Sequence, residues 1–508
     1  MSTADASGDV LFVVMDTVRK DHLSVYGYDR PTTPNLEAFA ADATVFEQAV
    51  APAPWTLPVH ASLFTGLYPS QHGASQETPY LEGATTLAET LSDSHATSCY
   101  SSNAWITPYT HLTDGFDDQD NFFEMMPGGA LSGPIARAWK ALNDNDSLRR
   151  VADWMVSVGN RFHEYFASAE GADSKTPQVI DATAEFVESA AARDEPFFSF
   201  VNLMDAHLPY HPPEEYAAEF APGVDATEVC QNSKEYNCGA RDVDDAEWAD
   251  IEGLYDAEIR HIDAQLGRLF DEMRAQGTYE ETMIVVCADH GELFGEHDLY
   301  GHEFNVYDPL INVPLLIKHP ELDADRREDQ VELLDLYHTV LDHCGADAAD
   351  ATQPLDPTRS LLSDRYREFE NGPDHPERVA VDPEYAFVEY YRPVVELKQL
   401  ENKAAAAGIE LDEDSRFYSR MRAARRPDGK YVRNERISDE CYALDADPAE
   451  TENLVGSGEQ LVETVETTLS TFEDRVGGEW KDRDGDGDAL EDMGEDAKNR
   501  LEDLGYID

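Results

Sequence analysis

Three short apolar runs, each closed by charged or imidazole side chains, most constrain the fold of this chain. They are residues 10–16 (VLFVVMD), 197–207 (FFSFVNLMDAH) and 282–292 (TMIVVCADHGE). Continuous apolar runs rich in β-branched and aromatic residues are typical of strands buried on both faces of a parallel sheet. The sequence therefore predicts three core strands with polar side chains at their carboxyl ends.

Helical patterns separate these strands. Residues 247–277, for example, place apolar side chains three and four positions apart and close on a glycine. Strands that alternate with helices predict an α/β fold with a large, mostly parallel sheet sandwiched by helices. Ligands bind beyond the carboxyl ends of such strands, so we expect the polar side chains there to line one crevice. They are Asp16, His207, Asp289 and His290.

The stretch 289–302 concentrates histidines and carboxylates directly after the third strand, and it holds three of the chain's 16 histidines. Asp289 and His290 together offer a carboxylate and an imidazole to a divalent ion, and Asp16 offers a second carboxylate. A polar loop on an acidic protein is the alternative interpretation. The density of histidines after a buried strand favours a metal site.

Residues 52–66 (PAPWTLPVHASLFTG) indicate a proline-braced loop that runs into a helix. Thr56 stands near the start of that helix, where a threonine commonly caps the first turn. A hydroxyl becomes a nucleophile only with a base or a metal beside it. Because three ligands leave a position open on the ion, we expect Thr56 to be its fourth ligand and the nucleophile. The two roles are compatible, since a helix amino terminus also favours an anion.

The charge is strongly and evenly acidic. The chain has 104 Asp and Glu against 38 Lys and Arg, a net charge of -66. Such a surface suits a protein in concentrated salt, where screening removes its self-repulsion, so the sequence predicts a halophilic, archaeal protein rather than an ordinary acidic one. The absence of a basic patch argues against nucleic-acid binding. Anionic substrates would need a local positive centre, which a metal supplies.

The first residues lack a basic segment, and their apolar run stops at Asp16. No run of about 20 apolar residues occurs, so we expect no membrane span and a cytoplasmic location. The six cysteines are scattered without a CxxC motif. Free thiols are therefore expected. The alternative is a disulfide between Cys230 and Cys238, which lie close together in the sequence.

The change in sequence pattern along the chain predicts two domains. Residues 1–378 form a catalytic α/β domain with a helical insertion at 129–180, either a packed helical pair or a lid. Residues 379–508 form a smaller domain with a short antiparallel sheet and an acidic terminal helix. The stretch 482–494 has the spacing of a Ca²⁺ loop but ends on Met493, so we interpret it as acidic surface.

Taken together, these stretches resemble the sulfatase family of the alkaline phosphatase superfamily. The resemblance spans about residues 9–455, and its landmarks come in the family's order. They include the opening strand with its Asp, the loop PWTLPVHASLFTGLYPSQHG, the loop FVNLMDAHLPYHPP, the helix YDAEIRHIDAQLGRLFDEM and the strand and loop CADHGELFGEHDLYGH.

The resemblance implies a role for each matching position. Asp16, Asp289 and His290 would bind a single divalent metal, with Thr56 at the nucleophile position and His60 at that of the signature's Arg. His207 would contact the transferred group, and His302 would stabilise the same group or its leaving oxygen. Asn103 falls where many members have a substrate-binding Lys.

Several positions depart from the family's pattern. Typical members carry Cys or Ser in C/S-x-P-x-R, matured to formylglycine, whereas this chain has T-x-P-x-H at 56–60. Oxidation of Thr would give a ketone, so formylglycine is not expected. Asp16–Thr17 replaces a typical pair of Asp, and Asp289–His290 replaces Asp–Asn. The expected cofactor is one divalent ion, Mn²⁺, Zn²⁺, Ca²⁺ or Mg²⁺, and an imidazole ligand shifts the preference from Ca²⁺ toward Mn²⁺ or Zn²⁺.

The sequence thus predicts a metal-dependent hydrolase of sulfate, phosphate or phosphonate esters that forms a covalent ester on Thr56. Its substrate would be an anionic small molecule, glycan or lipid. A phosphodiesterase or phosphoglycerol-type transferase is one alternative, since the metal pair resembles phosphonate monoester hydrolases and the Thr resembles phosphoglycerol transferases. A catalytically silent member that binds anionic glycans is another.

Overall fold

The three predicted core strands lie side by side in the middle of one sheet. In this computed structural model, which describes residues 8–122, 174–320, 322–346, 352–362 and 385–477, β1 (Val10–Met15) runs parallel to β5 (Phe197–Leu203) on one side and to β6 (Met283–Ala288) on the other. All of the residues of these strands are buried. The carboxyl ends of the three strands therefore meet at one edge of the sheet, as predicted.

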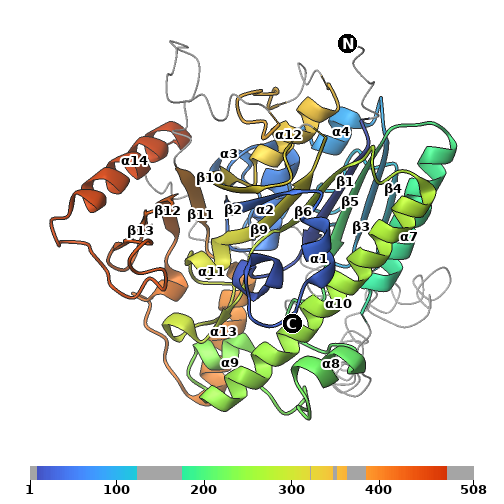
Figure 1. Ribbon diagram of the computed structural model, residues 1–508. Helices are drawn as coiled ribbons and strands as arrows, with labels where there is room; N and C mark the ends of the chain where they lie inside the picture. The colour runs from blue at the N-terminus through green and yellow to red at the C-terminus, as the bar shows by residue number, and fades with distance from the viewer. Residues whose placement is uncertain (1–7, 123–173, 321, 347–351, 363–384, 478–508) are drawn as a thin grey trace, which may run out of the picture.

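The complete sheet has eight strands in the order β10-β2-β9-β6-β1-β5-β3-β4 (Figure 1). The outer strands are β2 (Thr44–Val50), β3 (Ala96–Ser101), β4 (Asp118–Asn121), β9 (Asn312–Lys318) and β10 (Arg326–Glu332). Strand β9 runs antiparallel to its two neighbours, β2 and β6, and the other strand pairs of this sheet are parallel. The predicted large, mostly parallel sheet is confirmed.

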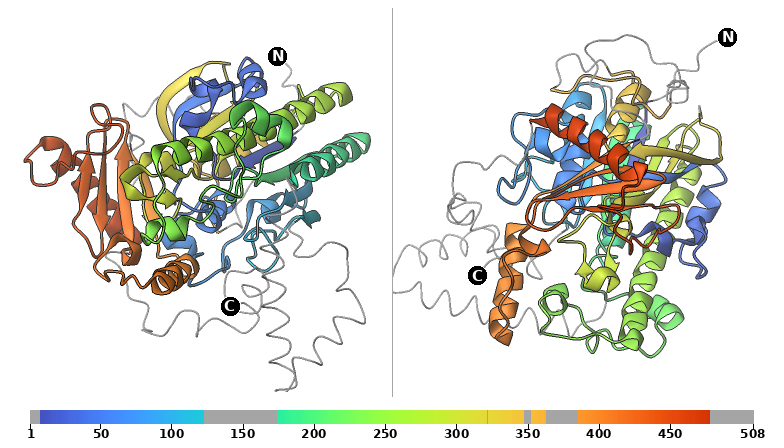
Figure 2. Two further views of the ribbon diagram at one scale, coloured as in Figure 1. Left: turned by 90° about the horizontal axis from the view of Figure 1, so that it is seen from below. Right: turned by 90° about the vertical axis from the view of Figure 1, so that its left-hand side faces the viewer.

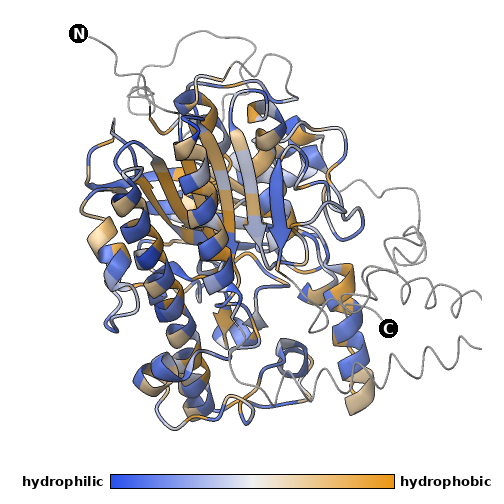
Figure 3. Cartoon of the chain, turned by 90° about the vertical axis from the view of Figure 1, so that its right-hand side faces the viewer, coloured by the Kyte–Doolittle hydropathy of each residue, from blue (hydrophilic) through white to orange (hydrophobic). Residues whose placement is uncertain are grey.

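Helices cover both faces of this sheet (Figures 1 and 2). One layer contains α1 (Pro34–Phe39), α7 (Thr176–Ala192) and α10 (Asp245–Gln276), and the other contains α2 (Thr56–Thr65), α3 (Pro69–His72), α4 (Leu87–Leu91) and α12 (Asp335–His343). Most strands between them are apolar, whereas the outer faces of the helices are polar (Figure 3). Helix α10 matches the helix predicted at 247–277. Asp244 caps its start by accepting backbone N–H bonds, and Gly277 ends it in the left-handed conformation.

A smaller antiparallel sheet follows at the C-terminal side. Its strands are β11 (Ala386–Tyr390), β12 (Met421–Arg426), β13 (Gly429–Asn434) and β14 (Glu440–Tyr442). Helix α14 (Gln460–Val476) packs against it, with the ring of Phe472 stacked 4.2 Å from that of Phe387. The structure thus contains the predicted short antiparallel sheet and helix. The predicted boundary at 378/379, most of the insertion at 129–180 and the stretch 482–494 lie outside the described residues.

The remaining elements are short and connect these layers. They are α8 (Glu214–Phe220), α9 (Ser233–Asn237), α11 (Asp308–Ile311), α13 (Val394–Ala407), the strands β7 (Leu293–Phe294) and β8 (Tyr300–Gly301), and 3-10 turns at Lys20–His22, Ser24–Tyr26, Glu296–Asp298 and Arg416–Tyr418. The six cysteines are free thiols, Cys230 and Cys238 included. None of the helices in the described part of the chain has the length and apolar character that a membrane crossing requires.

A buried ion cluster joins the small sheet to the large one. The Arg425 guanidinium on β12 bonds to the Asp308 carboxylate at 2.7 Å and, also at 2.7 Å each, to the side-chain oxygens of Gln48 on β2 and Gln330 on β10. Burial favours the neutral form of Asp308, but Arg425 and Lys430 outweigh it and hold the pKa of Asp308 below its usual value. Because Arg425 is only 2% exposed, these bonds form away from water.

We expect Arg425→Met to lower the free energy of unfolding by about 3–5 kcal/mol, because it leaves buried acceptors without their charged partner. Chemical denaturation in concentrated salt measures this change. The matched control is Arg193→Met, which removes an ion pair with Glu195 between side chains 49% and 45% exposed. The control should change stability by less than about 0.5 kcal/mol. Equal effects of the two substitutions would contradict the role given to the cluster.

Candidate active site

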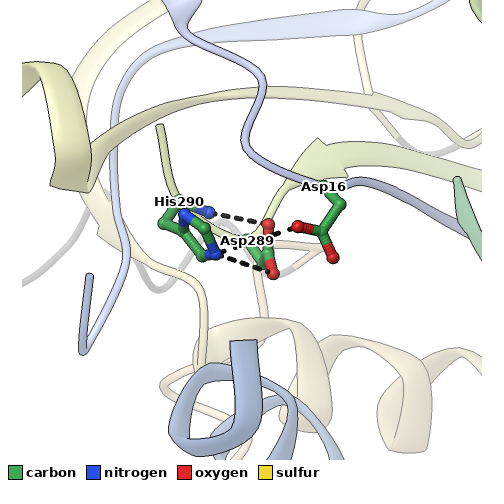
Figure 4. A group of neighbouring side chains, drawn as sticks. All are labelled: Asp16, Asp289 and His290. Carbon is green, nitrogen blue, oxygen red and sulfur yellow. Dashed lines mark hydrogen bonds and ion pairs between the residues drawn. The ribbon is translucent and has the colours of Figure 1, made fainter. Parts of the chain in front are cut away.

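Two adjacent strands bring together the predicted metal ligands. Asp16 follows β1, and Asp289 and His290 follow β6, so the parallel pairing of these strands places the three side chains at one point (Figure 4). His290 Nε2 lies 3.9 Å from Asp16 Oδ1 and 3.4 Å from Asp289 Oδ2. One ligand atom from each residue lies within 4.8 Å of the other two. No other such group of His, Cys, Asp or Glu occurs within the ranges that the structure describes.

Each carboxylate of the cluster uses one oxygen for hydrogen bonds and leaves the other facing His290. Asp289 Oδ1 accepts the backbone N–H bonds of His290 at 2.9 Å and Thr17 at 3.3 Å. Asp16 Oδ2 accepts bonds from Asn103 Nδ2 at 2.7 Å and Asn202 Nδ2 at 3.2 Å. The remaining oxygens, Asp16 Oδ1 and Asp289 Oδ2, are buried without a hydrogen-bond partner among the described residues.

The imidazole of His290 is held in the form that a metal binds. Its Nδ1 lies 3.0 Å from the Gly291 carbonyl, to which it donates, so Nε2 carries the lone pair that faces the two carboxylates. Burial, with the neighbouring His302, lowers the pKa of His290 well below its ordinary value, so this ring is neutral. Histidines that bind a metal through one ring nitrogen typically donate a hydrogen bond from the other nitrogen, as His290 does here.

These residues fit a divalent cation. Burial and the neighbouring Asp16 raise the pKa of Asp289 well above its ordinary value, because the two carboxylates face each other away from water. A cation between them would satisfy both unpartnered oxygens and the Nε2 lone pair. The donor set, two carboxylate oxygens and one imidazole nitrogen, is one that Mn²⁺ and Zn²⁺ accept.

Thr56 lies beside this cluster at the first residue of α2. The extended backbone of Trp55 leads into the helix, and Thr56 Oγ1 reaches to 3.4 Å from His290 Nε2 and 3.4 Å from Asn103 Nδ2. The side chain is 5% exposed. The structure thus brings Asn103, a predicted substrate-binding residue, into contact with both the predicted nucleophile and the ligand Asp16.

His60 lies one helical turn beyond Thr56 and is fully buried. Its Nδ1 donates to the Thr56 carbonyl at 2.9 Å, and its ring packs edge-on against Phe64 and Phe200. Burial lowers its pKa, so the ring is neutral. His60 therefore contacts the backbone, and not the hydroxyl, of the predicted nucleophile Thr56. Its Nδ1 also lies 3.8 Å from Asp289 Oδ2.

The two other predicted histidines meet at the same place. The ring of His302 lies 4.5 Å from that of His290 and 5.3 Å from that of His207. His207 Nδ1 donates to the Leu208 carbonyl at 2.6 Å, which fixes the ring. Burial disfavours a charge on His302, but Glu303 and Glu292 outweigh it and raise the pKa of His302 to about 9. At neutral pH His302 is therefore protonated and can donate a proton.

Other candidate groups of the same stretches lie outside the cluster. The Thr17 hydroxyl donates to the Ala206 carbonyl at 2.6 Å, so it is engaged elsewhere. The ring of His297 stacks 3.6 Å from that of Tyr307, and Glu296 pairs with Arg19. His211, the other histidine of its loop, is tied by its backbone N–H to Glu258.

Two buried residues received no role from the sequence. Glu292 lies 3.4 Å from His302 Nδ1 and also accepts a bond from the Tyr210 hydroxyl at 3.3 Å. Asn202 is a fully buried residue of β5, and its side-chain amide donates a hydrogen bond to the Asp16 carboxylate. The signal for Asn202 was a polar side chain inside an otherwise apolar strand. Glu292 could be noticed only as one of several carboxylates in an acidic loop.

The sheet order and the metal-ligand cluster together define an α/β architecture of the alkaline phosphatase and sulfatase kind. The family model described as Sulfatase matches residues 8–346. The chain belongs to the sulfatase family.

Two relatives of this chain are named as sulfatases. The chain is 24% identical over 353 residues to the uncharacterized sulfatase YidJ of Escherichia coli, covering 65% of this chain and 66% of that protein. It is 27% identical over 336 residues to an ulvan-active sulfatase of Formosa agariphila, covering 63% of this chain and 57% of that protein. The chain thus spans two thirds or less of the length of these relatives.

A solved structure shares the fold over nearly the whole chain. It is the phosphonate monoester hydrolase of Agrobacterium radiobacter, with a TM-score of 0.61 and 20% identity, covering 92% of this chain and 94% of that one.

We expect the metal-free protein to gain about 1–3 kcal/mol of stability from Asp289→Asn, because the substitution removes one of two facing buried charges. In excess Mn²⁺ or Zn²⁺ the order should reverse, since only the wild type binds the ion tightly and gains stability from it. Thermal unfolding with chelator and with each ion measures both differences. The control is Asp263→Asn, whose carboxylate accepts bonds from Leu36 and Asn35, so its loss should destabilise the protein with and without metal. A wild type indifferent to every ion would contradict the metal assignment.

Proposed function

We propose that this sulfatase-family chain is a metal-dependent hydrolase of an anionic sulfate or phosphorus ester, with Thr56 as its nucleophile. One observation carries the proposal. A buried hydroxyl at the start of α2 lies 3.4 Å from His290 Nε2, beside two carboxylate oxygens without partners. A hydroxyl becomes a nucleophile beside a base or a metal, and these unpartnered oxygens and the Nε2 lone pair are the donors that would hold a metal next to Thr56. The bound ion would polarise the ester oxygen and favour the ionised hydroxyl.

The side chains around Thr56 suit a two-step displacement. The Thr56 hydroxyl would lose its proton to solvent when an ion is bound, and the ionised Oγ1 forms a bond to sulfur or phosphorus as the bond to the leaving oxygen breaks. Protonated His302 donates its proton to that leaving oxygen. His207, whose ring lies 5.3 Å from that of His302, would contact the transferred group. In the second step neutral His302 takes a proton from water as the water oxygen bonds to sulfur or phosphorus, and Thr56 Oγ1 leaves with both bonding electrons, so that both side chains return to their starting forms. The ester bond of the substrate is hydrolysed and Thr56 is regenerated.

The hydroxyl nucleophile favours a phosphorus ester over a sulfate ester. A formylglycine hydrate can expel sulfate through its second hydroxyl, but Thr56 has only one, so the second step requires direct displacement. A threonine phosphate ester is the more readily displaced of the two. The phosphonate monoester hydrolase with the same fold agrees with this choice, whereas the ulvan-active sulfatase among the relatives favours a sulfated glycan. We therefore propose a phosphodiester or phosphonate monoester first and a sulfate ester second.

We expect Thr56→Ala to lower kcat/KM by at least about 10³-fold, while Thr56→Ser retains most of the activity because it keeps the hydroxyl. Aryl sulfate, bis-aryl phosphate and aryl phosphonate monoester should be assayed with Mn²⁺ and with Zn²⁺ in concentrated salt. The matched control is Thr65→Ala at the far end of α2, where the hydroxyl donates to the Ala61 carbonyl. That control should leave kcat/KM within about threefold.

Two results would overturn the proposal. Full activity of Thr56→Ala on every hydrolysed ester would remove the nucleophile assignment. A wild type that binds the ion but hydrolyses none of the three esters would favour the silent, anion-binding member of the family instead.

A further inference from the structure

We propose that the Asn103 and Asn202 amides are positioning residues that restrict Asp16 to one free oxygen, and that this restriction makes the centre select Mn²⁺ or Zn²⁺ over Ca²⁺. The inference rests on the proposed metal-dependent function and concerns which ion the site takes. It goes beyond the ligand set, because both asparagines act on Asp16 and not on the ion.

Both amides bind the same carboxylate oxygen. Asn103 Nδ2 lies 2.7 Å and Asn202 Nδ2 3.2 Å from Asp16 Oδ2. Asn202 reaches Asp16 because β5 and β1 are parallel neighbours whose register pairs Asn202 with Val14, two residues before Asp16. Two N–H donors on one oxygen fix the plane of the carboxylate. Only Oδ1 of Asp16 then faces the cluster.

The orientation of both amides is itself fixed. The Ser101 hydroxyl donates to Asn202 Oδ1 at 3.2 Å and accepts the backbone N–H of Asn103 at 2.9 Å. Asn103 Oδ1 accepts the backbone N–H of Trp105 at 2.8 Å. Since both amide oxygens are occupied by donors, both amide nitrogens must point to Asp16. Asn202, Asn103 and Ser101 are 0, 2 and 1% exposed, so water does not compete for these bonds.

The second carboxylate is restricted in the same way, by backbone. Asp289 Oδ1 accepts the N–H groups of His290 and Thr17, which no side-chain substitution removes. The centre thus offers one oxygen from each Asp, His290 Nε2 and the Thr56 hydroxyl. Ca²⁺ takes six to eight oxygen ligands and often a carboxylate with both oxygens, whereas Mn²⁺ and Zn²⁺ accept fewer ligands and favour imidazole. A set of one-oxygen carboxylates therefore discriminates against Ca²⁺.

Asn202→Ala tests this inference because it removes one of the two bonds that hold Asp16 Oδ2, and so loosens the carboxylate without touching any ligand. We expect its affinity for Mn²⁺ and Zn²⁺ to fall by about 10–100-fold, as is usual when a residue that orients a ligand is lost. Its affinity for Ca²⁺ should change by less than about threefold, since a loosened carboxylate can turn to offer both oxygens to that ion. The ratio of Mn²⁺ to Ca²⁺ affinity should therefore fall at least about threefold, a change that general destabilisation would not produce.

The experiment is calorimetric titration of the full chain, stripped by chelator, with Mn²⁺, Zn²⁺ and Ca²⁺ separately in concentrated salt. Ser199→Ala is the matched control. Like the bond between Ser101 and Asn202, the 2.9 Å bond from Ser98 to Ser199 joins β3 to β5, but it does not involve Asp16. This variant should leave all three affinities unchanged. Asn103→Ala serves as a second variant should Asn202→Ala fail to fold, and the same fall in the ratio is expected of it.

The outcomes separate the two proposals. A wild type that binds none of the ions would overturn the metal-dependent function. A wild type that binds Mn²⁺ or Zn²⁺, with variants whose affinities for all ions fall by one common factor or not at all, would leave that function standing and overturn the role of the amides. A wild type that prefers Ca²⁺ would overturn the selectivity.

Discussion

The repulsion between two buried carboxylates is the constraint on which the rest of the site depends. Asp16 and Asp289 stand at the ends of adjacent parallel strands, and each is fully buried with one oxygen unpartnered. The repulsion is relieved either by a proton, which is why the pKa of Asp289 is raised, or by the cation that we propose. The neutral His290 and the Thr56 hydroxyl would complete the donors to that ion, and protonated His302 adds a positive group beside them. In a chain of net charge -66, the proposed ion and His302 would together provide the local positive charge that an anionic ester requires.

The small antiparallel sheet contributes to this site from a distance. The backbone N–H of Glu389 on β11 donates to the Pro52 carbonyl at 2.9 Å, in the loop that leads to Thr56. The Glu389 carboxylate is fully buried, accepts the backbone N–H of Ser70 at 2.7 Å and pairs with Arg422 at 2.9 Å. Thr56 therefore lies on a helix whose entry is fixed by a sheet formed more than 300 residues later in the chain.

Local pattern was enough to predict the core strands and Asp16, Asp289 and His290, because an apolar strand closed by a polar residue has that residue at the sheet edge. The same pattern placed His207 at this edge, and Thr56 was expected there as the fourth ligand of the ion, whereas the position of His302 followed from the family resemblance. What the sequence could not predict depends on register and side-chain orientation. Asn202 meets Asp16 only through the pairing of β5 with β1, and Glu292 meets His302 only through the fold of the loop after β6. The full burial of His60 against Phe200 likewise needs the strand behind it.

The central claim is that Thr56 carries the transferred group during turnover. Rapid acid quenching of the metal-loaded protein with an activated phosphodiester or aryl sulfate, followed by peptide mass spectrometry, tests it directly. The expected result is a covalent phosphoryl or sulfuryl adduct on the Thr56 side chain. The Thr56→Ser variant should carry the same adduct on its serine, and the Thr56→Ala variant should carry none. Turnover with the adduct on another residue, or with no adduct while Thr56→Ala remains active, would contradict it.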